Sequence, residues 1–477
     1  MEQKNSIPLK LNMKRTFIIG FAFFGILLLW QVYDVWCPTL LQEAFMEMTG
    51  ATKSEDVQYL VGVMMALDNL AALILMPIFG KLSDKTHTKL GKRMPYILVG
   101  TFVCAIAFPF VPLFFHFNNY VGMIVMMAIV LIFAMMYRNP AVALMPDLTP
   151  KPLRSKANGI INIMGYIGGA FATLVGMVFV LTDYLGDGKE TWAKGNVWAI
   201  VGPFLVASVL MVISAVVLIF TIRENELAVE LADELAEGEK QAAVADSVED
   251  DDEKPMSKAN FIMLILILAA EFFWFMSDNG VATFMLNYSR AFLGAKSSGN
   301  MIMTLIGGVG SVIGFAAGGF IADKIGRKWT ISSGLMLAIL GYISWIIFQF
   351  AIGKGAFDEK TGYYSFPLYL YLVWGIKGFG MSLVHLNSFP MVVELCSKKK
   401  VGQFTGYYYM ASMAAQTITP ILLGLLLRNE NIEWSVLPIY ALICSSISFV
   451  VFLFVKNIKA HKVANAKGLE GLGAGDD

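Results

Sequence analysis

The chain has 477 residues, of which 57% are hydrophobic and only 15% are charged. An average soluble domain carries about 25% charged residues, so this composition excludes a soluble globular protein and predicts a polytopic membrane protein. Lysine and arginine together number 36, as do aspartate and glutamate, which gives a formal net charge of zero. The four cysteines (Cys37, Cys104, Cys396 and Cys444) stand far apart, so the sequence predicts neither a disulfide framework nor a metal site.

Apolar runs long enough to cross a bilayer occur twelve times along the chain. A transmembrane helix needs about 20 mostly apolar residues. The first run follows Lys14 and Arg15 and lacks a small-residue cleavage site, which favours a retained first helix over a signal peptide. The runs occupy residues 16–41, 58–82, 94–115, 120–146, 157–181, 197–222, 259–288, 299–322, 329–351, 367–393, 402–427 and 436–455.

The distribution of lysine and arginine among the short loops predicts the orientation of the chain. Basic residues gather in the loops at 81–93, 151–156, 324–328 and 398–400, whereas the opposite loops carry only scattered ones. Loops rich in lysine and arginine face the cytoplasm in membrane proteins. We therefore expect a multi-pass protein with both termini in the cytoplasm, in a plasma membrane and more specifically in a bacterial inner membrane.

An acidic segment divides the chain in two. Residues 223–258 hold 13 acidic and 4 basic side chains, and they separate the sixth apolar run from the seventh. Residues 224–239 could form a surface helix, whereas the acidic run at 247–253 is typical of solvated, disordered chain. We interpret the segment as a tether rather than a regulatory element. The predicted domains are an N-terminal six-helix bundle, an acidic cytoplasmic linker, a C-terminal six-helix bundle and a cytoplasmic tail, at residues 1–222, 223–258, 259–456 and 457–477.

A loop motif after the second apolar run recurs after the eighth. Each copy combines glycine, which permits close packing at a helix end, with an aspartate among basic residues that can pair with them or face a helix N-terminus. We interpret both copies as breakable contacts of a cytoplasmic gate, with acids and an arginine from the loops after the fourth and tenth runs. The predicted gate residues are Gly80, Asp84, Gly91, Lys92, Arg93, Asp147, Arg154, Asp323, Gly326, Arg327, Lys328 and Glu394.

The two halves of the chain repeat each other beyond this motif. Trp30 and Asp34 in the first run match Trp274 and Asp278 in the seventh, with the same spacing of four residues. In the same way, the segment from Arg138 to Asp147 in the fourth run corresponds to the segment from His385 to Glu394 in the tenth. A repeat of this kind predicts two structurally related bundles of six helices that move against each other.

These motifs resemble those of the major facilitator superfamily, whose twelve helices form two pseudo-symmetric six-helix bundles. The resemblance implies an all-α membrane protein of that fold. The first loop is longer than the general pattern and ends in Gly91, Lys92, Arg93 and Pro95. This form resembles the sucrose and maltose transporter branch of the glycoside-pentoside-hexuronide:cation symporters, as do the segments Arg138-Asn139-Pro140, Pro146-Asp147-Leu148-Thr149-Pro150 and Arg154-Ser155-Lys156-Ala157-Asn158-Gly159.

One departure from the wider symporter family bears on the coupling ion. Melibiose-type members carry paired aspartates in the second helix, at positions that here are Ala72 and Met76. The resemblance therefore implies a proton rather than sodium as the coupling ion.

Ionisable residues inside the apolar runs are few, and each needs a partner or a function. On insertion scales such a residue costs about 2.5 to 3.5 kcal/mol at the centre of a bilayer. A carboxyl group facing a shared cavity is a candidate proton carrier, because burial disfavours its charge. The alternative for Asp34 and Asp278 is a static ion pair with Arg138 or Lys377. The alternative for His385 is a packing role. The full set is Asp34, Asp68, Arg138, Glu271, Asp278, Lys377 and His385.

Aromatic and amide side chains inside the runs are candidate sugar contacts. Sugars are recognised by aromatic faces and by planar groups that accept or donate two hydrogen bonds. Aromatic residues in membrane helices more often face lipid, but Trp30 and Trp274 each lie one turn from an aspartate on the same face. The candidates are Trp30, Gln31, Asn69, Asn139, Asn162, Trp274, Asn279, Asn387 and Gln416.

Taken together, the sequence and its resemblance predict a proton-coupled symporter of a sugar, by resemblance an α-glucoside such as maltose or sucrose, that works by alternating access. Its partners are a small-molecule sugar, a proton and the lipid bilayer; we expect a monomer and no binding of nucleic acid, cofactor or metal. Two alternatives stay open: an exporter of amphipathic compounds, and a sugar sensor that does not transport. The sequence shows no pairing of a nucleophile with a base, so it does not predict an enzyme.

Overall fold

Long helices correspond to the apolar runs, because in hydrocarbon only a helix or a closed barrel satisfies all backbone polar groups. The computed structural model is almost entirely helical and describes residues 9–185, 196–247, 258–352, 357–358, 363–395, 401–429 and 433–456. The predicted tail at 457–477, most of the acidic run at 247–253 and the basic loop at 398–400 lie outside the described residues.

The first half of the chain forms one group of helices. The third predicted span is divided into α3 and α4 at Phe108 and Pro109, where proline interrupts the backbone ladder. The elements are α1 (Met13–Thr49), η1 (Ser54–Val57), α2 (Gln58–Lys85), α3 (Met94–Ala107), α4 (Phe110–His116), α5 (Tyr120–Asp147), η2 (Lys151–Leu153), α6 (Arg154–Val178), α7 (Thr182–Leu185) and α8 (Trp198–Thr221).

The second half forms a corresponding group. It also holds a two-residue antiparallel pair of strands, β1 (Phe357–Asp358) and β2 (Tyr363–Tyr364). The linker supplies α9 (Glu224–Glu230) and α10 (Ala232–Ser247). The remaining elements are α11 (Lys258–Ala291), α12 (Ser297–Ile325), α13 (Arg327–Ile347), η3 (Phe348–Ile352), α14 (Leu368–Val393), α15 (Val401–Leu427), η5 (Glu433–Ser435) and α16 (Val436–Leu453).

Eleven helices in the described residues are long and apolar enough to cross a membrane. The helix α14 has 26 residues and a matching length, and it packs against α12 and α13, but it is not one of those eleven. The fold is therefore an all-helical membrane fold of the predicted kind, although the expected count of twelve spans is not reproduced in full.

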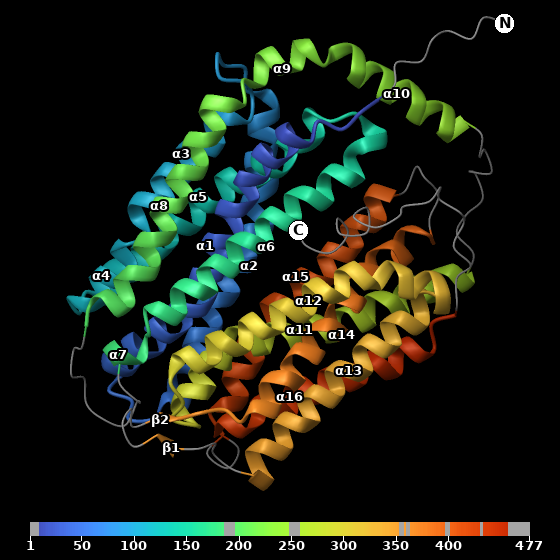
Figure 1. The fold of residues 1–477 in the computed structure, drawn as a ribbon. Helices are drawn as coiled ribbons and strands as arrows, with labels where there is room; N and C mark the ends of the chain where they lie inside the picture. Colours follow the sequence, from blue (N-terminus) through green and yellow to red (C-terminus); the bar gives the residue numbers. More distant parts are fainter. Residues whose placement is uncertain are drawn as a thin grey trace, which may run out of the picture.

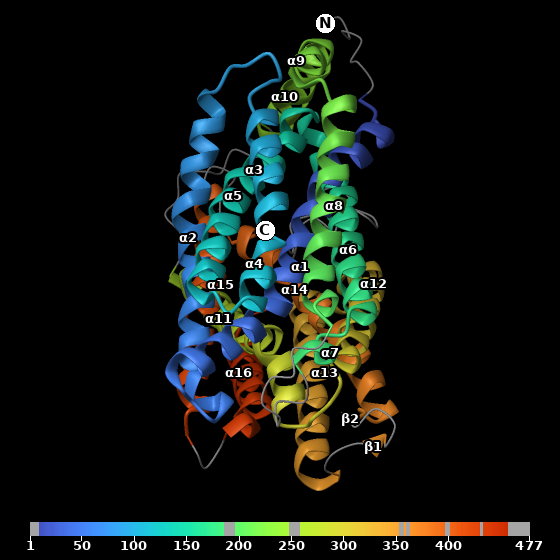
Figure 2. The ribbon, with the colours of Figure 1, turned by 90° about the vertical axis from the view of Figure 1, so that its left-hand side faces the viewer.

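Figures 1 and 2 show that the two helical groups lie side by side with their long axes roughly parallel. The helices α9 and α10 lie at one end of the molecule, which we call the α9 end. The helix α7 and the strands β1 and β2 lie at the opposite end, which we call the α7 end. In Figure 1 the two groups converge toward the α7 end and spread apart toward the α9 end.

Small residues allow the closest helix contacts in the second half. A Cβ atom at Gly310 of α12 would collide with the backbone of Gly375 in α14, and one at Gly378 would collide with the backbone of Gly307. Without a hydrophobic driving force between helices in lipid, such backbone contact is a main source of packing energy. This stripe of glycines fixes α12, which forms one wall of the central cavity, against α14.

The linker helices belong to the first half of the molecule. Leu231 is buried, and Leu227 and Leu235 pack against the same hydrophobic core. Lys151 forms an ion pair with Glu239 of α10 at 3.1 Å. The predicted surface helix at residues 224–239 is thus present as α9 and α10, and it is docked rather than free.

Candidate functional site

A cavity of about 660 Å³ lies between the two halves of the molecule. Its walls come from α1, α2, α5 and α6 of the first half and from α11, α12 and α15 of the second. Ligand pockets for small molecules commonly span about 300 to 1,000 Å³. The cavity is therefore large enough for a small organic solute, and its two walls belong to parts of the chain that are far apart in sequence.

The helix α1 supplies one polar stripe of the first wall. Leu27, Trp30, Gln31 and Asp34 follow one another at steps of three, one and three residues, so all four lie on the same helix face. Asp68 and Asn69 join them from α2, Arg138 from α5, and Tyr166 and Thr173 from α6.

All charged residues of the cavity lining come from this first wall: Asp34, Asp68 and Arg138. Arg138 interacts electrostatically with Asp34, and its guanidinium carbon lies 6.0 Å from the ring centre of Trp30. The carboxyl group of Asp68 interacts with the buried hydroxyl of Tyr33 instead. The first wall thus combines an acid near an arginine with a second acid that faces only a hydroxyl and the charge of Asp34.

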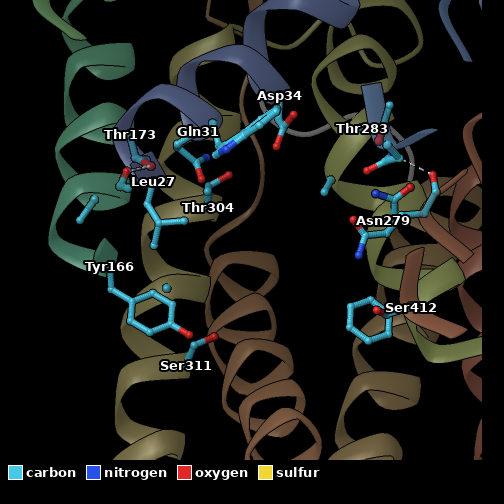
Figure 3. Close-up of a pocket in the computed structure, with 18 of the residues that line it drawn as sticks. Leu27, Gln31, Asp34, Tyr166, Thr173, Asn279, Thr283, Thr304, Ser311 and Ser412 are labelled. Atoms are coloured by element: carbon cyan, nitrogen blue, oxygen red, sulfur yellow. Dashed lines mark hydrogen bonds between the residues drawn. The ribbon is translucent and has the colours of Figure 1, made fainter. Parts of the chain in front are cut away.

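The opposite wall carries neutral polar and aromatic groups. Figure 3 shows Asn279, Thr283 and Ser412 across the cavity from Gln31, Asp34 and Tyr166. Asn279 and Thr283 are one turn apart on α11, which places both side chains on one face. The second half also contributes Phe275, Tyr408, Tyr409 and Gln416 to the lining. Thr304 and Ser311 of α12 belong to the second half too, but Figure 3 shows them on the side of Gln31 and Tyr166.

The structure brings half of the predicted binding and coupling residues together. Trp30, Gln31, Asp34, Asp68, Asn69, Arg138, Asn279 and Gln416 line the cavity. The other predicted residues do not line it: Asn139, Asn162, Glu271, Trp274, Asp278, Lys377, His385 and Asn387. Sequence reasoning missed Tyr166, Thr173, Thr283, Thr304, Ser311, Tyr408, Tyr409 and Ser412, which are small or hydroxylated residues common in any membrane helix.

Asp278 pairs with Lys377 inside the second half. The Nζ atom of Lys377 donates to a carboxylate oxygen of Asp278 at 2.6 Å, and it lies 5.7 and 5.4 Å from the rings of Tyr342 and Trp374. This arrangement is the static ion pair that the sequence left open as an alternative. The repeat-related aspartates therefore have different surroundings: Asp34 lines the cavity, and Asp278 is neutralised within its own bundle.

Other predicted residues make contacts within the bundles. Asn139 donates to the carbonyl of Met76 at 2.8 Å and so ties α5 to α2. Asn387 donates to the carbonyl of Leu383 in its own helix at 2.9 Å. The ring of His385 packs edge-on against Trp274, with ring centres 4.4 Å apart.

The described ranges contain no group of three or more His, Cys, Asp or Glu side chains arranged to hold a metal ion.

The first loop motif forms a charge network centred on Arg93. This arginine bonds to Asp147 at 2.8 Å and to Asp84 at 2.5 Å, and Lys92 also reaches Asp147 at 3.0 Å. Although burial opposes its charge, the two carboxylates hold the pKa of Arg93 above its ordinary value, so the cation persists at any pH a transport assay uses.

A residue of the linker, more than 100 positions later in the chain, also joins this network. The carboxylate of Glu224 in α9 accepts hydrogen bonds from the backbone N–H groups of Lys92, Arg93 and Met94, at distances from 2.9 to 3.2 Å. These are unsatisfied donors at the start of α3, where the helix dipole favours a negative charge. Gly91, with φ of 112°, makes the turn that presents them.

The second loop motif repeats part of this arrangement. Arg327 pairs with Glu394, as Arg93 pairs with the corresponding Asp147. Gly326 adopts φ of 84°, a left-handed conformation that favours glycine, as Gly91 does in the first half.

The other predicted gate residues stay within their own half. Lys328 donates to the carbonyl of Leu453 at 2.8 Å, and Arg154 donates to the carbonyl of Thr149 at 3.1 Å. Asp323 is exposed at the end of α12, and Gly80 lies against the side chain of Asn139. The contacts described for the two motifs are therefore made inside each bundle, at the end where the two helical groups spread apart.

Polar contacts at the α7 end, which sequence reasoning did not predict, join the two halves. Arg290 of α11 pairs with Glu43 of α1, and the two side chains are only 3% and 8% exposed. One turn away, Thr39 donates to Asn287 at 2.5 Å. Gln42 donates to Glu43 at 3.2 Å. We call Thr39, Glu43, Asn287 and Arg290 the seam cluster.

More exposed contacts surround the seam cluster. Lys53 lies 3.8 Å from Glu433, and Lys296 lies 3.4 Å from Asp183, with all four side chains at least about a third exposed. Trp434 donates to the hydroxyl of Ser54 at 3.0 Å. The α7 end is therefore closed by a buried core of polar contacts with a solvated rim.

A family model described as Major Facilitator Superfamily matches residues 16–357 and 268–474. No curated protein matches the sequence. Among solved structures, the inward-open xylose transporter XylE from E. coli aligns with a TM-score of 0.62 and 15% identity, covering 96% of this chain and 98% of that one.

Two other solved structures are similar over nearly their whole length. A bacterial homologue of the iron transporter ferroportin, in an inward-facing state, gives a TM-score of 0.61 at 13% identity and covers 94% of this chain and 99% of that one. The nucleoside transporter NupG gives 0.59 at 14% identity, covering 93% and 100%. At these identities the likeness shows the fold alone, and the named substrates are diverse.

Proposed function

The chain belongs to the Major Facilitator Superfamily, and on that basis we propose that it is a proton-coupled symporter of a sugar that works by alternating access. The proposed substrate is an α-glucoside disaccharide such as maltose or sucrose, in keeping with the resemblance to the sucrose and maltose branch. The α9 end would face the cytoplasm, in keeping with the loops rich in lysine and arginine.

The observation that carries this proposal is the composition of the central cavity. It joins the acids Asp34 and Asp68 and the cation Arg138 on one wall to a neutral wall of hydroxyl, amide and aromatic groups on the other. Carboxyl groups at this depth are costly unless they have a function or a partner. A neutral polyol fits the second wall, because hydroxyl and amide side chains both donate to and accept from sugar hydroxyls.

The two ends of the molecule support alternating access. The seam cluster closes the α7 end, whereas the charge networks of the loop motifs stay within their own halves at the α9 end. In the opposite conformation the seam would part and the α9 ends of the bundles would meet. The cavity walls would then be exposed to the other side of the membrane, which is how rocking bundles move a bound solute.

The test is uptake of labelled maltose and sucrose by cells or vesicles containing the protein, with and without a protonophore. We expect accumulation against a gradient that the protonophore abolishes. Accumulation that persists with the protonophore, or uptake that never exceeds equilibration for any disaccharide in a screen, would refute proton-coupled symport.

A second candidate is an exporter of amphipathic compounds, which the apolar part of the cavity lining favours. The helix α12 contributes Leu305, Val309, Val312, Ile313 and Phe315 to the wall, and methionines at 65 and 135 line the opposite side. Methionine and aromatic side chains adapt to differently shaped apolar ligands. Proton-driven efflux of an amphipathic dye, with no sugar-stimulated proton uptake, would favour this candidate.

A further inference from the structure

We propose that Asp68 binds the coupled proton and that the contact between α2 and α15 controls its access to water. This inference rests on the proposed symport and names the residue that carries out its proton step. It follows from the partners of the buried acids and from the position of Asp68 at the boundary between the two halves.

The carboxyl group of Asp68 is buried and has no cationic partner in the described residues. Its Oδ2 atom is fully buried and has no hydrogen-bond partner in the described part of the chain. Its carboxyl group interacts with the hydroxyl of Tyr33, which is 1% exposed. A carboxylate ion with so little compensation is costly as long as water is kept from it, so Asp68 favours a bound proton while it is shielded and can release it when water reaches it.

The groups around Asp68 do not supply the missing positive charge. Asp34 carries the same sign, and Arg138 acts on Asp34. A like charge nearby disfavours a second carboxylate ion. The titratable and charged groups that face Asp68 or its part of the cavity are Tyr33, Asp34 and Cys37 from α1, Arg138 from α5, and Tyr408 and Tyr409 from α15.

Two other acids inside the membrane spans have a cation nearby, whereas Glu271 of α11 does not. Glu271 is buried with both carboxyl oxygens unpartnered in the described residues, but it does not line the cavity. Asp278 binds Lys377 at 2.6 Å, and Asp34 lies within the field of Arg138. A cation beside an acid favours its charged form, fully in the ion pair of Asp278 and only in part at Asp34, where burial acts in the opposite direction. Among the acids that line the cavity, Asp68 is therefore the one suited to change its protonation state.

The contact between α2 and α15 covers the α7 side of Asp68. The next residue, Asn69, donates to the carbonyl of Gln416 in α15 at 3.3 Å. Farther toward the α7 end, Gly62 packs against the backbone of Pro420 and Gly424 packs against that of Gln58. When the bundles rock and this contact opens, Asp68 gains access to the side of the membrane from which it is now shielded.

The proton step involves only one oxygen–hydrogen bond. On the α7 side, hydronium gives a proton to the Asp68 carboxylate, forming the carboxylic acid and water. After rocking, water in the cavity takes the proton back on the α9 side and leaves the carboxylate. Because the sugar occupies the same cavity, each cycle moves the sugar and the proton in the same direction.

The experiment uses proteoliposomes that contain the full chain with Asp68→Asn, which keeps the shape but cannot ionise. We expect loss of concentrative uptake of labelled maltose or sucrose driven by a proton gradient. Counterflow of the same sugars, which needs no net proton movement, should persist and lose its dependence on pH. The conservative variant Asp68→Glu should restore gradient-driven uptake, which also shows that the site folds.

The control is the repeat-related acid, removed together with its cation as Asp278→Asn/Lys377→Met. This double variant should keep gradient-driven uptake, because it deletes a neutral pair outside the cavity lining. Gradient-driven uptake that survives in Asp68→Asn would overturn the inference, as would its loss in the double variant alone. In either case the symport by the wild type would stand.

A second measurement does not depend on the substrate. The infrared carbonyl band of a protonated carboxyl group, recorded as the wild-type protein is titrated, should be lost in Asp68→Asn and shifted in Asp68→Glu. If no sugar is transported by the wild type, the proposed symport fails, and this band still decides whether Asp68 binds a proton. An unchanged band in Asp68→Asn would overturn the assignment.

Discussion

Replacing Arg290 with glutamine should shift the protein away from the conformation that is closed at the α7 end. Arg290 and Glu43 form a buried pair across the two halves, and the substitution leaves the Glu43 carboxylate with the 3.2 Å hydrogen bond from Gln42 but no cation. Removing one partner of a buried ion pair costs about 3 to 5 kcal/mol. In the conformation open at this end, water would reach Glu43 and most of that cost would vanish.

The magnitude follows from the difference between the two conformations. Each 1.4 kcal/mol changes an equilibrium constant tenfold, so a cost of about 3 to 5 kcal/mol moves the conformational equilibrium by roughly two to three and a half orders of magnitude. Spin labels in place of Lys53 and Glu433 report this change, because these exposed residues face each other across the halves at 3.8 Å. In a cysteine-free background, Arg290→Gln should produce a population with longer label distances.

The exposed pair between Lys296 and Asp183 provides a matched control on the same seam. Surface ion pairs contribute about 0 to 1 kcal/mol, so Lys296→Gln should leave the label distances unchanged. Glu43→Gln/Arg290→Gln removes both charges and should return much of the population to the short distance. Unchanged distances in a folded Arg290→Gln protein, or equal shifts in both single variants, would refute this reasoning.

Three further predictions concern packing, the second-half ion pair and the first loop motif. Gly62→Val places a side chain against the backbone of Pro420 and should lengthen the same label distances, whereas Gly406→Val, with open space around it, should not. Lys377→Met leaves Asp278 unpaired and should lower stability by about 3 kcal/mol in thermal unfolding, and adding Asp278→Asn should recover most of it. Asp84→Ala removes an acid that is 60% exposed, so stability should change by less than about 1 kcal/mol while uptake falls; wild-type uptake would contradict a role in the gate.

The sequence predicted the helical fold well because apolar runs report directly on membrane spans. It also predicted, through the repeat, that Glu394 corresponds to Asp147, and each of these acids pairs with an arginine of the loop motif in its own half. Local patterns of this kind survive folding, because the residues that carry them lie on the same or adjacent helices.

The ion pair of the seam cluster was missed because the predicted spans end where the apolar runs end. The first and seventh spans were placed at 16–41 and 259–288, but α1 continues to Thr49 and α11 to Ala291. Glu43 and Arg290 therefore looked like loop residues. The available signal was the absence of glycine and proline from residues 42–49, between the end of the apolar run and Gly50, whose φ of 71° ends α1.

The sequence also does not predict which side chains pair when they are far apart in the chain. Asp34 and Asp278 occupy equivalent places in the repeat, yet only the second has a lysine within hydrogen-bonding distance. Lys377 was visible as an intramembrane cation, but its choice of partner depends on how α11 and α14 pack. The cap that Glu224 provides for α3 bridges more than 130 residues and has no local pattern.

The most direct test of the account is the movement of protons when sugar enters without any imposed gradient. Proteoliposomes in weakly buffered medium would be given maltose or sucrose while the external pH is recorded. The account predicts that the medium becomes more alkaline as the sugar enters, and that a protonophore removes the change. Sugar entry with no change in pH would contradict it.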